Sequence, residues 1–425
     1  MKTLRLRFSL ILALALAIVS KTTAQITPSN LNLGEEISWK GKLTLKNIDE
    51  ARTSVWNTWK QANTRLETQP LPPIQDMNEV TAHSWNMIEE DPMPFYWGKK
   101  GEVGANGRAL FINIHGSGPK EHEWSANLAW VRRYEDAPSA YFVPQIPSEQ
   151  RYRWWFRPEQ LAWEKLFRLA FLDESINPKK FYFVGISEGG YGSQRLGAFY
   201  ADYLAGAGPM AGGEPLVNAP VLNFRKIAFT LETGEGDKWF GRNTNTLLAK
   251  EAFDELSMAF PGDFKHRIRL QEGREHGIDY TFVTPWLINF DREAQPKSFS
   301  WVNFPMHDRY RSGFYNLAVL EPMNISSDQV VDRAVLKVDI IDNSIYLSAN
   351  TLNRDTHEIG EVTKGKLRFY LSPELVDLNK SIKLYVNGKL YYEGKVKMGV
   401  EHLVSSCETF GDPLRLFPAA LDIQF

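Results

Sequence analysis

Cysteine and histidine are scarce in this chain. One cysteine, Cys407, and eight histidines occur among its 425 residues. A single cysteine excludes an intrachain disulfide and a metal site built from several thiolates. No two histidines have the i, i+4 spacing of a helical metal-binding motif. We therefore expect Cys407 to be an inert buried residue, and we expect the protein to require no metal and no other cofactor.

An excess of positive charge is also missing. The chain has 49 lysines and arginines against 51 aspartates and glutamates, which gives a formal net charge of −2. Surfaces that bind nucleic acid usually carry a basic excess, so we expect no nucleic-acid partner. Beyond the N-terminal 24 residues no run is long and apolar enough for a membrane helix. This predicts no membrane insertion, and none of these features predicts an oligomeric state.

Residues 1–24 have the three parts of a secretory signal. Basic residues at the start are followed by an apolar run at 8–19 and by small residues at 22–24. This order is typical of a cleaved export signal. No cysteine lies near the cleavage site, so a lipoprotein anchor is not expected. The sequence therefore predicts an exported protein, periplasmic or secreted.

Residues 108–295 predict an α/β domain. Apolar β-branched and aromatic runs alternate there with amphipathic segments, a pattern that predicts a doubly wound, mainly parallel sheet covered by helices on both faces. We expect strands at 109–114, 139–143, 181–184, 227–231 and 267–270, and helices at 159–172, 190–203 and 245–260.

The segments on either side of this α/β domain have different sequence patterns. Residues 25–107 contain an amphipathic helix at 48–61 and a proline-rich break, and we expect them to form an N-terminal extension that packs on the α/β domain. Residues 296–425 consist of short alternating runs, which predict a separate, all-β sandwich. Asn387-Gly388 predicts a tight hairpin turn between the last two expected strands.

A serine lies between two glycines directly after the expected strand 181–184, in the sequence Gly185-Ile186-Ser187-Glu188-Gly189. A helical segment follows at once. Gly-x-Ser-x-Gly between a strand and a helix is the pattern of a nucleophile elbow, in which a sharp turn lifts the serine hydroxyl clear of the sheet. Side chains at the two glycines would collide with the neighbouring strand or helix. We expect Ser187 to be a nucleophile.

A serine nucleophile needs a base, and the base needs an acid that orients it. After the strand 227–231 comes a glycine-containing loop that ends in Asp237, which is our candidate acid; Glu235 and Glu232 are lesser candidates. After the strand 267–270 comes His276, our candidate base. Six other histidines lack a comparable position at the end of a strand: His83, His122, His266, His307, His357 and His402. The expected catalytic residues are therefore Ser187, Asp237 and His276, in that chain order.

The expected strand 109–114 ends in His115-Gly116-Ser117-Gly118. Glycines allow backbone N–H groups to approach a developing oxyanion without obstruction by side chains. We expect the oxyanion to be held by the N–H of Glu188 together with that of Gly116 or Ser117. His115 is expected to orient this loop rather than to take part in the chemistry.

Arginines and aromatic residues are interleaved in the segment 151–157. Aromatic faces can stack on a sugar ring, and arginine binds carboxylates bidentately. A substrate-binding rim of this kind would suit a sugar that bears a carboxylate; alternatively, the aromatics anchor a cap and the arginines are solvated. The candidate rim residues are Arg151, Arg153, Trp154, Trp155 and Arg157, with Trp239 and Arg242 after the candidate acid.

These motifs together resemble the α/β-hydrolase superfamily over residues 108–290. The resemblance is closest to secreted esterases that include feruloyl and acetylxylan esterases, esterase-D-like enzymes and polyhydroxyalkanoate depolymerases. It is carried by 115–118, by 176–180 leading into the elbow, by Gly-Glu-Gly-Asp at 234–237 and by Glu-His-Gly at 275–277. Residues 296–425 are similar to β-sandwich modules that follow such hydrolases. The chain departs from the usual pattern at Glu188, where smaller or uncharged residues are frequent; this carboxylate could bias the substrate charge or bind a cation.

The resemblance implies a serine carboxylic-ester hydrolase. Export and the arginine-rich segment favour an ester of a plant polysaccharide, with the uronate methyl ester of pectin ahead of acetyl and feruloyl esters. Two alternatives remain open at this point. One is a serine peptidase of the prolyl-oligopeptidase kind, and the other is a non-catalytic carbohydrate-binding protein.

Overall fold

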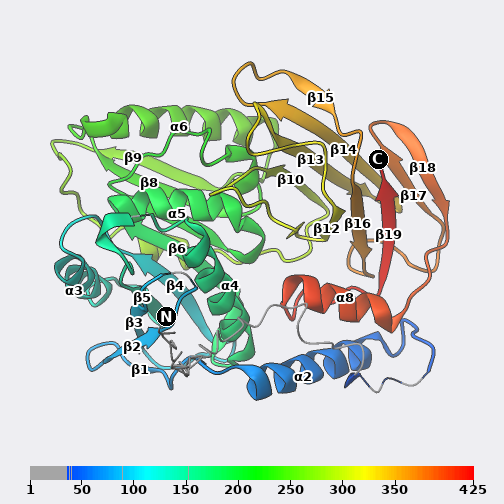
Figure 1. The fold of residues 1–425 in the computed structure, drawn as a ribbon, viewed down its shortest axis with the longest axis horizontal. Coiled ribbons are helices and arrows are strands. Elements are labelled where there is room, and N and C mark those ends of the chain that lie inside the picture. Colours follow the sequence, from blue (N-terminus) through cyan, green and yellow to red (C-terminus); the bar gives the residue numbers. More distant parts are fainter. Residues whose placement is uncertain (1–35, 38, 40, 89, 152) are drawn as a thin grey trace, which may run out of the picture.

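The computed structural model describes residues 36–425 apart from 38, 40, 89 and 152. The expected export signal at 1–24 lies outside these described residues. A large sheet with helices on both faces forms one part of the molecule, and two smaller sheets form the other (Figure 1). The expected fold class, an α/β protein with a large, mostly parallel sheet followed by further β structure, is confirmed.

The large sheet has the strand order β2-β3-β5-β4-β6-β7-β8-β9, with β1 beside β3. From β5 to β9 all neighbouring strands are parallel, whereas β3 runs antiparallel to β5. The strands are β1 (Gln75–Asp76), β2 (Ala82–Trp85), β3 (Met93–Lys100), β4 (Arg108–Ile114), β5 (Ser139–Pro144), β6 (Ile176–Ile186), β7 (Gly206–Met210), β8 (Ala228–Gly234) and β9 (His266–Gln271). The carboxyl ends of the parallel strands meet at one edge of the sheet, where loops can assemble a site.

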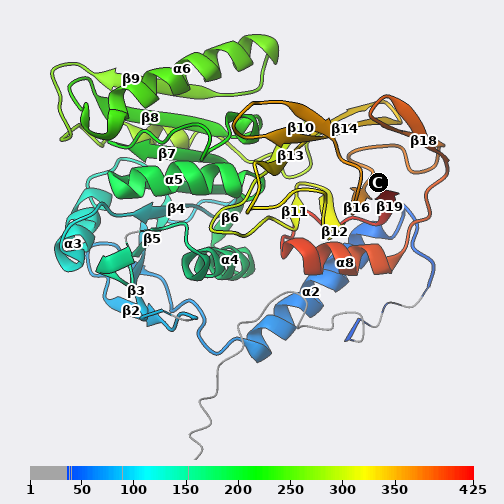
Figure 2. The same ribbon diagram turned by 45° about the horizontal axis from the view of Figure 1, so that its top comes forward.

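Alternating side chains of the central strands face opposite sides of the sheet. In β4, Leu110 and Ile112 belong to the apolar core that includes buried residues of helices α4, α5 and α6, whereas Phe111 belongs to the core formed with α3 and α7. The sheet is therefore covered on both faces (Figure 2). These helices are α3 (Lys120–Val131), α4 (Arg157–Leu172), α5 (Glu188–Phe199), α6 (Arg242–Ala259) and α7 (Val283–Leu287).

Residues 296–425 form a six-stranded sheet with the path β10-β13-β14-β17-β18, to which β15 is added, and a four-stranded sheet with the order β11-β12-β16-β19. The predicted hairpin turn is confirmed, because Asn387 and Gly388 both have positive φ and join β17 to β18. This segment also contains one helix, α8 (Val400–Phe410). Its strands are β10 (Ser298–Asn303), β11 (Gly313–Phe314), β12 (Leu317–Glu321), β13 (Val331–Ile341), β14 (Ser344–Asn353), β15 (Ile359–Glu361), β16 (Lys366–Leu371), β17 (Ile382–Val386), β18 (Lys389–Gly394) and β19 (Ala419–Gln424).

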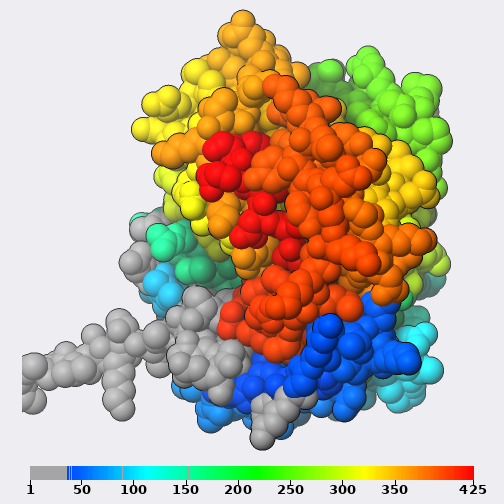
Figure 3. All heavy atoms as spheres, turned by 90° about the vertical axis from the view of Figure 1, so that its right-hand side faces the viewer, coloured from blue at the N-terminus to red at the C-terminus, as the bar shows by residue number. Residues whose placement is uncertain are grey.

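The N-terminal segment is built into both parts of the molecule. Strands β1 to β3, which we expected within an extension packed on the domain, instead pair into the large sheet beyond β5 and so cover an otherwise unpaired edge. The helix α2 (Ile48–Leu66) packs against α8, and Cys407 of α8 is buried in their shared core, as expected. In Figure 3 the blue N-terminal residues lie directly beneath the orange C-terminal residues. The domain limits themselves stay a prediction.

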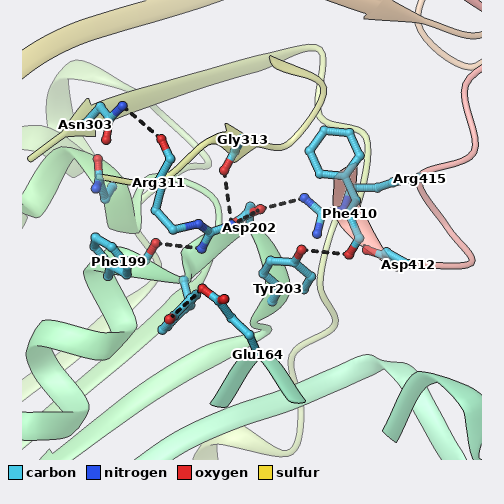
Figure 4. Close-up of polar contacts among 12 residues, drawn as sticks. Glu164, Phe199, Asp202, Tyr203, Asn303, Arg311, Gly313, Phe410, Asp412 and Arg415 are labelled. Atoms are coloured by element: carbon cyan, nitrogen blue, oxygen red, sulfur yellow. Dashed lines mark hydrogen bonds and ion pairs between the residues drawn. The ribbon is translucent and has the colours of Figure 1, made fainter. Parts of the chain in front are cut away.

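A buried network of charges joins the two parts (Figure 4). Asp202, which follows α5, accepts hydrogen bonds from Arg311 and Arg415 of the C-terminal segment. Arg415 also donates to Asp412, which pairs with Arg292. The side chains of Asp202, Arg415, Asp412 and Arg292 are fully buried. Each charge therefore depends on its partners for compensation.

Replacing Asp202 by alanine is expected to lower the free energy of unfolding by about 3–5 kcal/mol, because two buried arginines lose a counter-charge. Urea unfolding of the variant measures this loss. The control is Asp355→Asn, at an exposed aspartate whose one ion pair with a described residue is that with Arg354 at 3.6 Å. For this variant we expect a change below about 1 kcal/mol. Equal effects in the two variants would show that the network does not stabilise the junction.

None of the helices in the described part of the chain is long and apolar enough to cross a membrane.

Candidate active site

Ser187 lies on the turn between β6 and α5 with φ 57° and ψ −112°. This backbone conformation is rare for a residue with a side chain, and such strain is typical of functional turns. The glycines are required on both sides. A Cβ on Gly185 would lie 2.3 Å from the carbonyl oxygen of Gly189, and one on Gly189 would lie 2.1 Å from that of Ile114. The turn therefore has the geometry of a nucleophile elbow.

The structure brings the three expected catalytic residues together. The Nε2 atom of His276 lies 3.0 Å from Ser187 Oγ, and its Nδ1 atom lies 2.6 Å from Asp237 Oδ2. The Asp237 carboxylate is buried, with 1% of its side chain exposed, whereas 45% of the His276 side chain is exposed. An acid therefore orients the imidazole from the protein interior, and the imidazole reaches the serine at the surface.

Hydrogen bonds between two loops hold this pair in place. The loop after β8 donates from the N–H of Gly236 to the carbonyl of Arg274 in the loop after β9, at 2.8 Å. The lesser candidates for the acid are engaged elsewhere. Glu232 is buried and accepts two hydrogen bonds from Arg269, and Glu235 accepts one from the N–H of Gly273. Only Asp237 among the three hydrogen-bonds to the histidine.

Arg242 contacts the acid and does not lie on an exposed rim. Its Nη1 donates to Asp237 Oδ1 at 3.0 Å, and 9% of its side chain is exposed. The guanidinium also lies over the rings of Tyr191 and Phe240. This pairing was not among the expectations from the sequence, although the spacing of five residues across the start of α6 is short enough to allow it. Arg242 is a positioning residue for the carboxylate.

The loop after β4 lies against the nucleophile. A Cβ on Gly116 would lie 3.2 Å from Ser187 Cβ, so the Gly116 backbone passes beside the serine. Among the described residues, none accepts a hydrogen bond from the backbone N–H of Gly116, Ser117 or Glu188. The structure thus places the backbone of Gly116 beside Ser187, which Glu188 follows directly in the chain, and it does not choose between Gly116 and Ser117 as the second donor.

His115 has a structural position in this loop. It is 1% exposed, its Nδ1 lies 2.7 Å from the carbonyl oxygen of Gly116, and its Nε2 accepts a hydrogen bond from the N–H of Ile146 at 3.0 Å. Nδ1 must therefore carry the proton. This contact fixes the peptide between Gly116 and Ser117, and it directs the N–H of Ser117 away from the imidazole. Burial lowers the pKa of His115 to about 4.

Stability is expected to fall as the pH drops from 6.5 to 4, because the unfolded chain protonates His115 in this range and the folded chain does not. The loss from this one group is about 3 kcal/mol at pH 4. In His115→Gln the difference in free energy of unfolding between pH 7 and pH 4 should shrink by this amount, measured by urea unfolding. The control is His122→Gln, at an exposed histidine. If the difference in free energy of unfolding between pH 7 and pH 4 were the same in His115→Gln as in the wild type, His115 would not be a buried, neutral imidazole in the folded protein.

The expected substrate rim is only partly exposed. Trp154 is fully buried, and its Nε1 donates to the carbonyl of His115 at 3.0 Å, while Trp155 is 7% exposed beneath the guanidinium of Arg195. The expectation of an exposed rim is therefore wrong at both tryptophans and at Arg242. The loop folds inward because α5 offers a glycine, Gly192, against which Trp154 packs. Trp154 supports the loop of His115 instead.

The remaining rim residues lie at the surface. Trp239 is 74% exposed, and Arg153 and Arg157 are exposed. The side chain of Arg151 lies outside the described part of the structure. Arg153 Nη1 lies 3.1 Å from Glu188 Oε1, directly after the nucleophile. Burial raises the pKa of Glu188, and the charge of Arg153 opposes that shift.

Within the described residues, no group of three or more histidine, cysteine, aspartate and glutamate side chains is arranged to hold a metal ion. Glu188 in particular has an arginine as its partner. The arrangement at Ser187 is complete for nucleophilic acyl transfer without further groups: it has a nucleophile, a base, an acid that orients the base, and N–H donors for an oxyanion.

No family model matches the chain, and no curated protein matches it in sequence. Among solved structures, a thermostable esterase matches at a TM-score of 0.40 and 20% identity, over 51% of this chain and 64% of that one, less than two thirds of its length. Esterase 2 of Thermogutta terrifontis, phosphorylated by paraoxon, matches at a TM-score of 0.38 and 13% identity, over 52% of this chain and 94% of that one. FphF of Staphylococcus aureus, a fluorophosphonate-binding serine hydrolase, matches at a TM-score of 0.36 and 11% identity, over 49% of this chain and 98% of that one. At these values the activity of the chain must be inferred from its own residues.

Proposed function

We propose that the protein is a serine hydrolase of the α/β-hydrolase kind that cleaves carboxylic esters. The observation that carries this proposal is the hydrogen-bonded chain from Ser187 through His276 to Asp237, with distances of 3.0 and 2.6 Å. The strained turn at Ser187 supports it, because the protein stores strain at the position where the hydroxyl must be presented.

In the proposed mechanism His276 Nε2 takes the proton of Ser187 as Oγ attacks the carbonyl carbon of the ester. The oxyanion of the tetrahedral intermediate accepts hydrogen bonds from the N–H of Glu188 and from that of Gly116 or Ser117. The intermediate collapses to an acyl-enzyme, and the alcohol leaves with the proton from His276. Water then attacks the acyl group while His276 removes its proton, and the carboxylic acid departs as Ser187 regains its hydrogen.

We further propose that the protein is exported and that its substrate is an ester of a plant polysaccharide, with uronate methyl esters preferred over acetyl and feruloyl esters. The N-terminal 24 residues support export. The exposed Arg153, Arg157 and Trp239 support a sugar that carries a carboxylate. Arg153 already pairs with Glu188, so a substrate carboxylate would compete with that glutamate for the guanidinium.

Release of methanol from highly methylated pectin and of acetate from acetylated xylan tests this proposal. The purified protein and its Ser187→Ala variant are compared on both polymers. Serine-dependent methanol supports a uronate methylesterase. Serine-dependent acetate without methanol supports the ester hydrolase and contradicts the uronate preference. Absence of serine-dependent release from these polymers and from feruloylated xylan contradicts the polysaccharide assignment.

A further inference from the structure

A small cavity of about 150 Å³ adjoins the loop of Gly116 on the side of α3. Its walls include Gly116 itself and Ile186, the residue before the nucleophile. A Cβ on Gly116 would lie 3.0 Å from Glu123 Oε2 and 3.2 Å from Ser187 Cβ. Glu123 and the nucleophile therefore both lie next to Gly116, and a substrate held at Ser187 lies close to this cavity.

The polar side chains of the cavity offer hydrogen-bond acceptors. The carboxylate of Glu123 has no hydrogen-bond donor among the described residues, and burial raises its pKa. Asn127 is 2% exposed; its Nδ2 donates to the carbonyl of Asn113 at 2.8 Å, and its Oδ1 has no partner in the described structure. The amide cannot be turned round, because two oxygens would then face each other. Asn127 Oδ1 is therefore a buried acceptor without a partner, which is costly unless a donor meets it. The Glu123 carboxylate is half-buried.

Two aromatic rings complete the walls. Trp130 and Tyr280 meet edge to face, with their centroids 5.0 Å apart. Arg133 lies over the ring of Trp130 at 5.1 Å. Aromatic walls suit the apolar side of a sugar or a cationic group, and the acceptors suit a group that carries N–H or O–H. The mechanism above does not use Glu123, Asn127, Trp130 or Tyr280, although the charge of Glu123 interacts with that of His276.

We propose that this cavity, the Glu123 pocket, is a substrate subsite that accepts hydrogen bonds from a hydroxyl or ammonium group of the ester. Glu123 and Asn127 bind the donor, and Trp130 and Tyr280 enclose it. The inference rests on the proposed ester hydrolysis and adds a chemical requirement: the preferred ester carries a donor a few atoms from its carbonyl carbon. Glu123 is thereby a specificity-determining residue.

Isosteric esters test the pocket on the acyl side and on the alcohol side. Methyl butyrate, methyl 3-hydroxypropanoate and methyl 3-aminopropanoate carry a methyl, hydroxyl or ammonium group at one position of the acyl chain. Propyl acetate and 2-hydroxyethyl acetate make the same comparison in the alcohol. We expect a donor-bearing ester to have a kcat/KM about 10-fold or more above its methyl counterpart in at least one series, as for a hydrogen bond to a charged group. The hydroxyl and ammonium arms distinguish the two sources of the donor.

The Glu123→Gln variant should lower this preference, by about 10-fold for an ammonium and by less for a hydroxyl, because the charge is lost. Glu121→Gln, an exposed glutamate on the same helix, is the matched control and should keep the wild-type preference. Ala126→Leu, which fills the cavity, is a second route to the same loss. Ratios of kcat/KM within one enzyme are compared, so partial loss of folded protein does not affect the result.

A wild-type enzyme that hydrolyses the methyl-bearing esters through Ser187 but shows no donor preference in either series overturns the pocket and leaves the proposed function standing. A preference that Glu123→Gln and Ala126→Leu leave unchanged also overturns it. Absence of any serine-dependent hydrolysis in both series contradicts the proposed function, and the pocket assignment falls with it.

Discussion

Replacing Ser187 by alanine is expected to lower kcat for ester hydrolysis by about 10⁴-fold or more, because the variant has no oxygen that can form the acyl-enzyme. The Cβ of Ser187 is retained, so the strained turn and the fold should survive. The measurement is the rate of alcohol release from a simple methyl ester, with the melting temperature as a check on folding.

A second serine provides the control for this result. Ser125 is exposed on α3 and donates to the carbonyl of His122, and Ser125→Ala should retain nearly full activity. If Ser187→Ala kept more than about 1% of the wild-type rate, a loss of only two decades against the four or more expected of a nucleophile, Ser187 would not be the nucleophile.

Replacing Asp237 by asparagine is expected to lower kcat by about 10⁴-fold. The carboxylate accepts from Nδ1 of His276 at 2.6 Å and so keeps Nε2 free to take the proton of the serine. An amide can present its NH₂ group to Nδ1 and stabilise the wrong tautomer. The variant also leaves the buried Arg242 without its counter-charge, so the loss of activity should be accompanied by a lower melting temperature.

Glu235→Gln is the matched control for Asp237→Asn. It lies two residues earlier in the same loop, and its carboxylate accepts one hydrogen bond, from Gly273 at 3.3 Å. Its kcat should stay within a few-fold of wild type. Similar losses in the two variants would indicate a general effect of charge in this loop and would contradict the specific role of Asp237.

The main sheet and the elbow could be predicted because their signals are local. Buried apolar runs marked β4, β5, β6 and β8, and β9 lies at its expected position although only Ile268 of it is buried. β6 contains the expected strand 181–184 but begins earlier, at Ile176. The elbow needs glycines on both sides of Ser187 whatever the rest of the chain does. The carboxyl ends of parallel strands meet at one edge, so residues after β6, β8 and β9 could be expected to converge.

The helix α8 was not expected within residues 296–425, although its sequence has a helical pattern. Leu403, Cys407 and Phe410 recur at helical spacing and are all buried, and Gly411 follows in the left-handed conformation that ends many helices. α3 offered a weaker pattern, since only Asn127, Leu128 and Val131 of its twelve residues are buried. Its position follows from packing on the sheet rather than from its own periodicity.

The rim could not be predicted, because exposure in an irregular loop depends on what lies beneath it. Trp154 and Trp155 are adjacent in the sequence, and both turn inward, whereas Trp239 is 74% exposed. A sequence in which arginines lie beside tryptophans is compatible both with an exposed substrate rim and with tryptophans that are buried under the loop. The partners of Arg153 and Arg242 also required the fold, since each guanidinium pairs with a carboxylate of the candidate site, Arg242 in the interior and Arg153 at the surface.

Covalent labelling by a fluorophosphonate reagent tests the central claim most directly, because only a serine activated by a base reacts at an appreciable rate. Intact-mass analysis followed by peptide mapping identifies the modified residue. We expect one adduct per chain, located on Ser187, and its loss in both Ser187→Ala and His276→Ala. Unmodified wild-type protein, or an adduct on a residue other than Ser187, would contradict the assignment of Ser187, His276 and Asp237 as a catalytic triad.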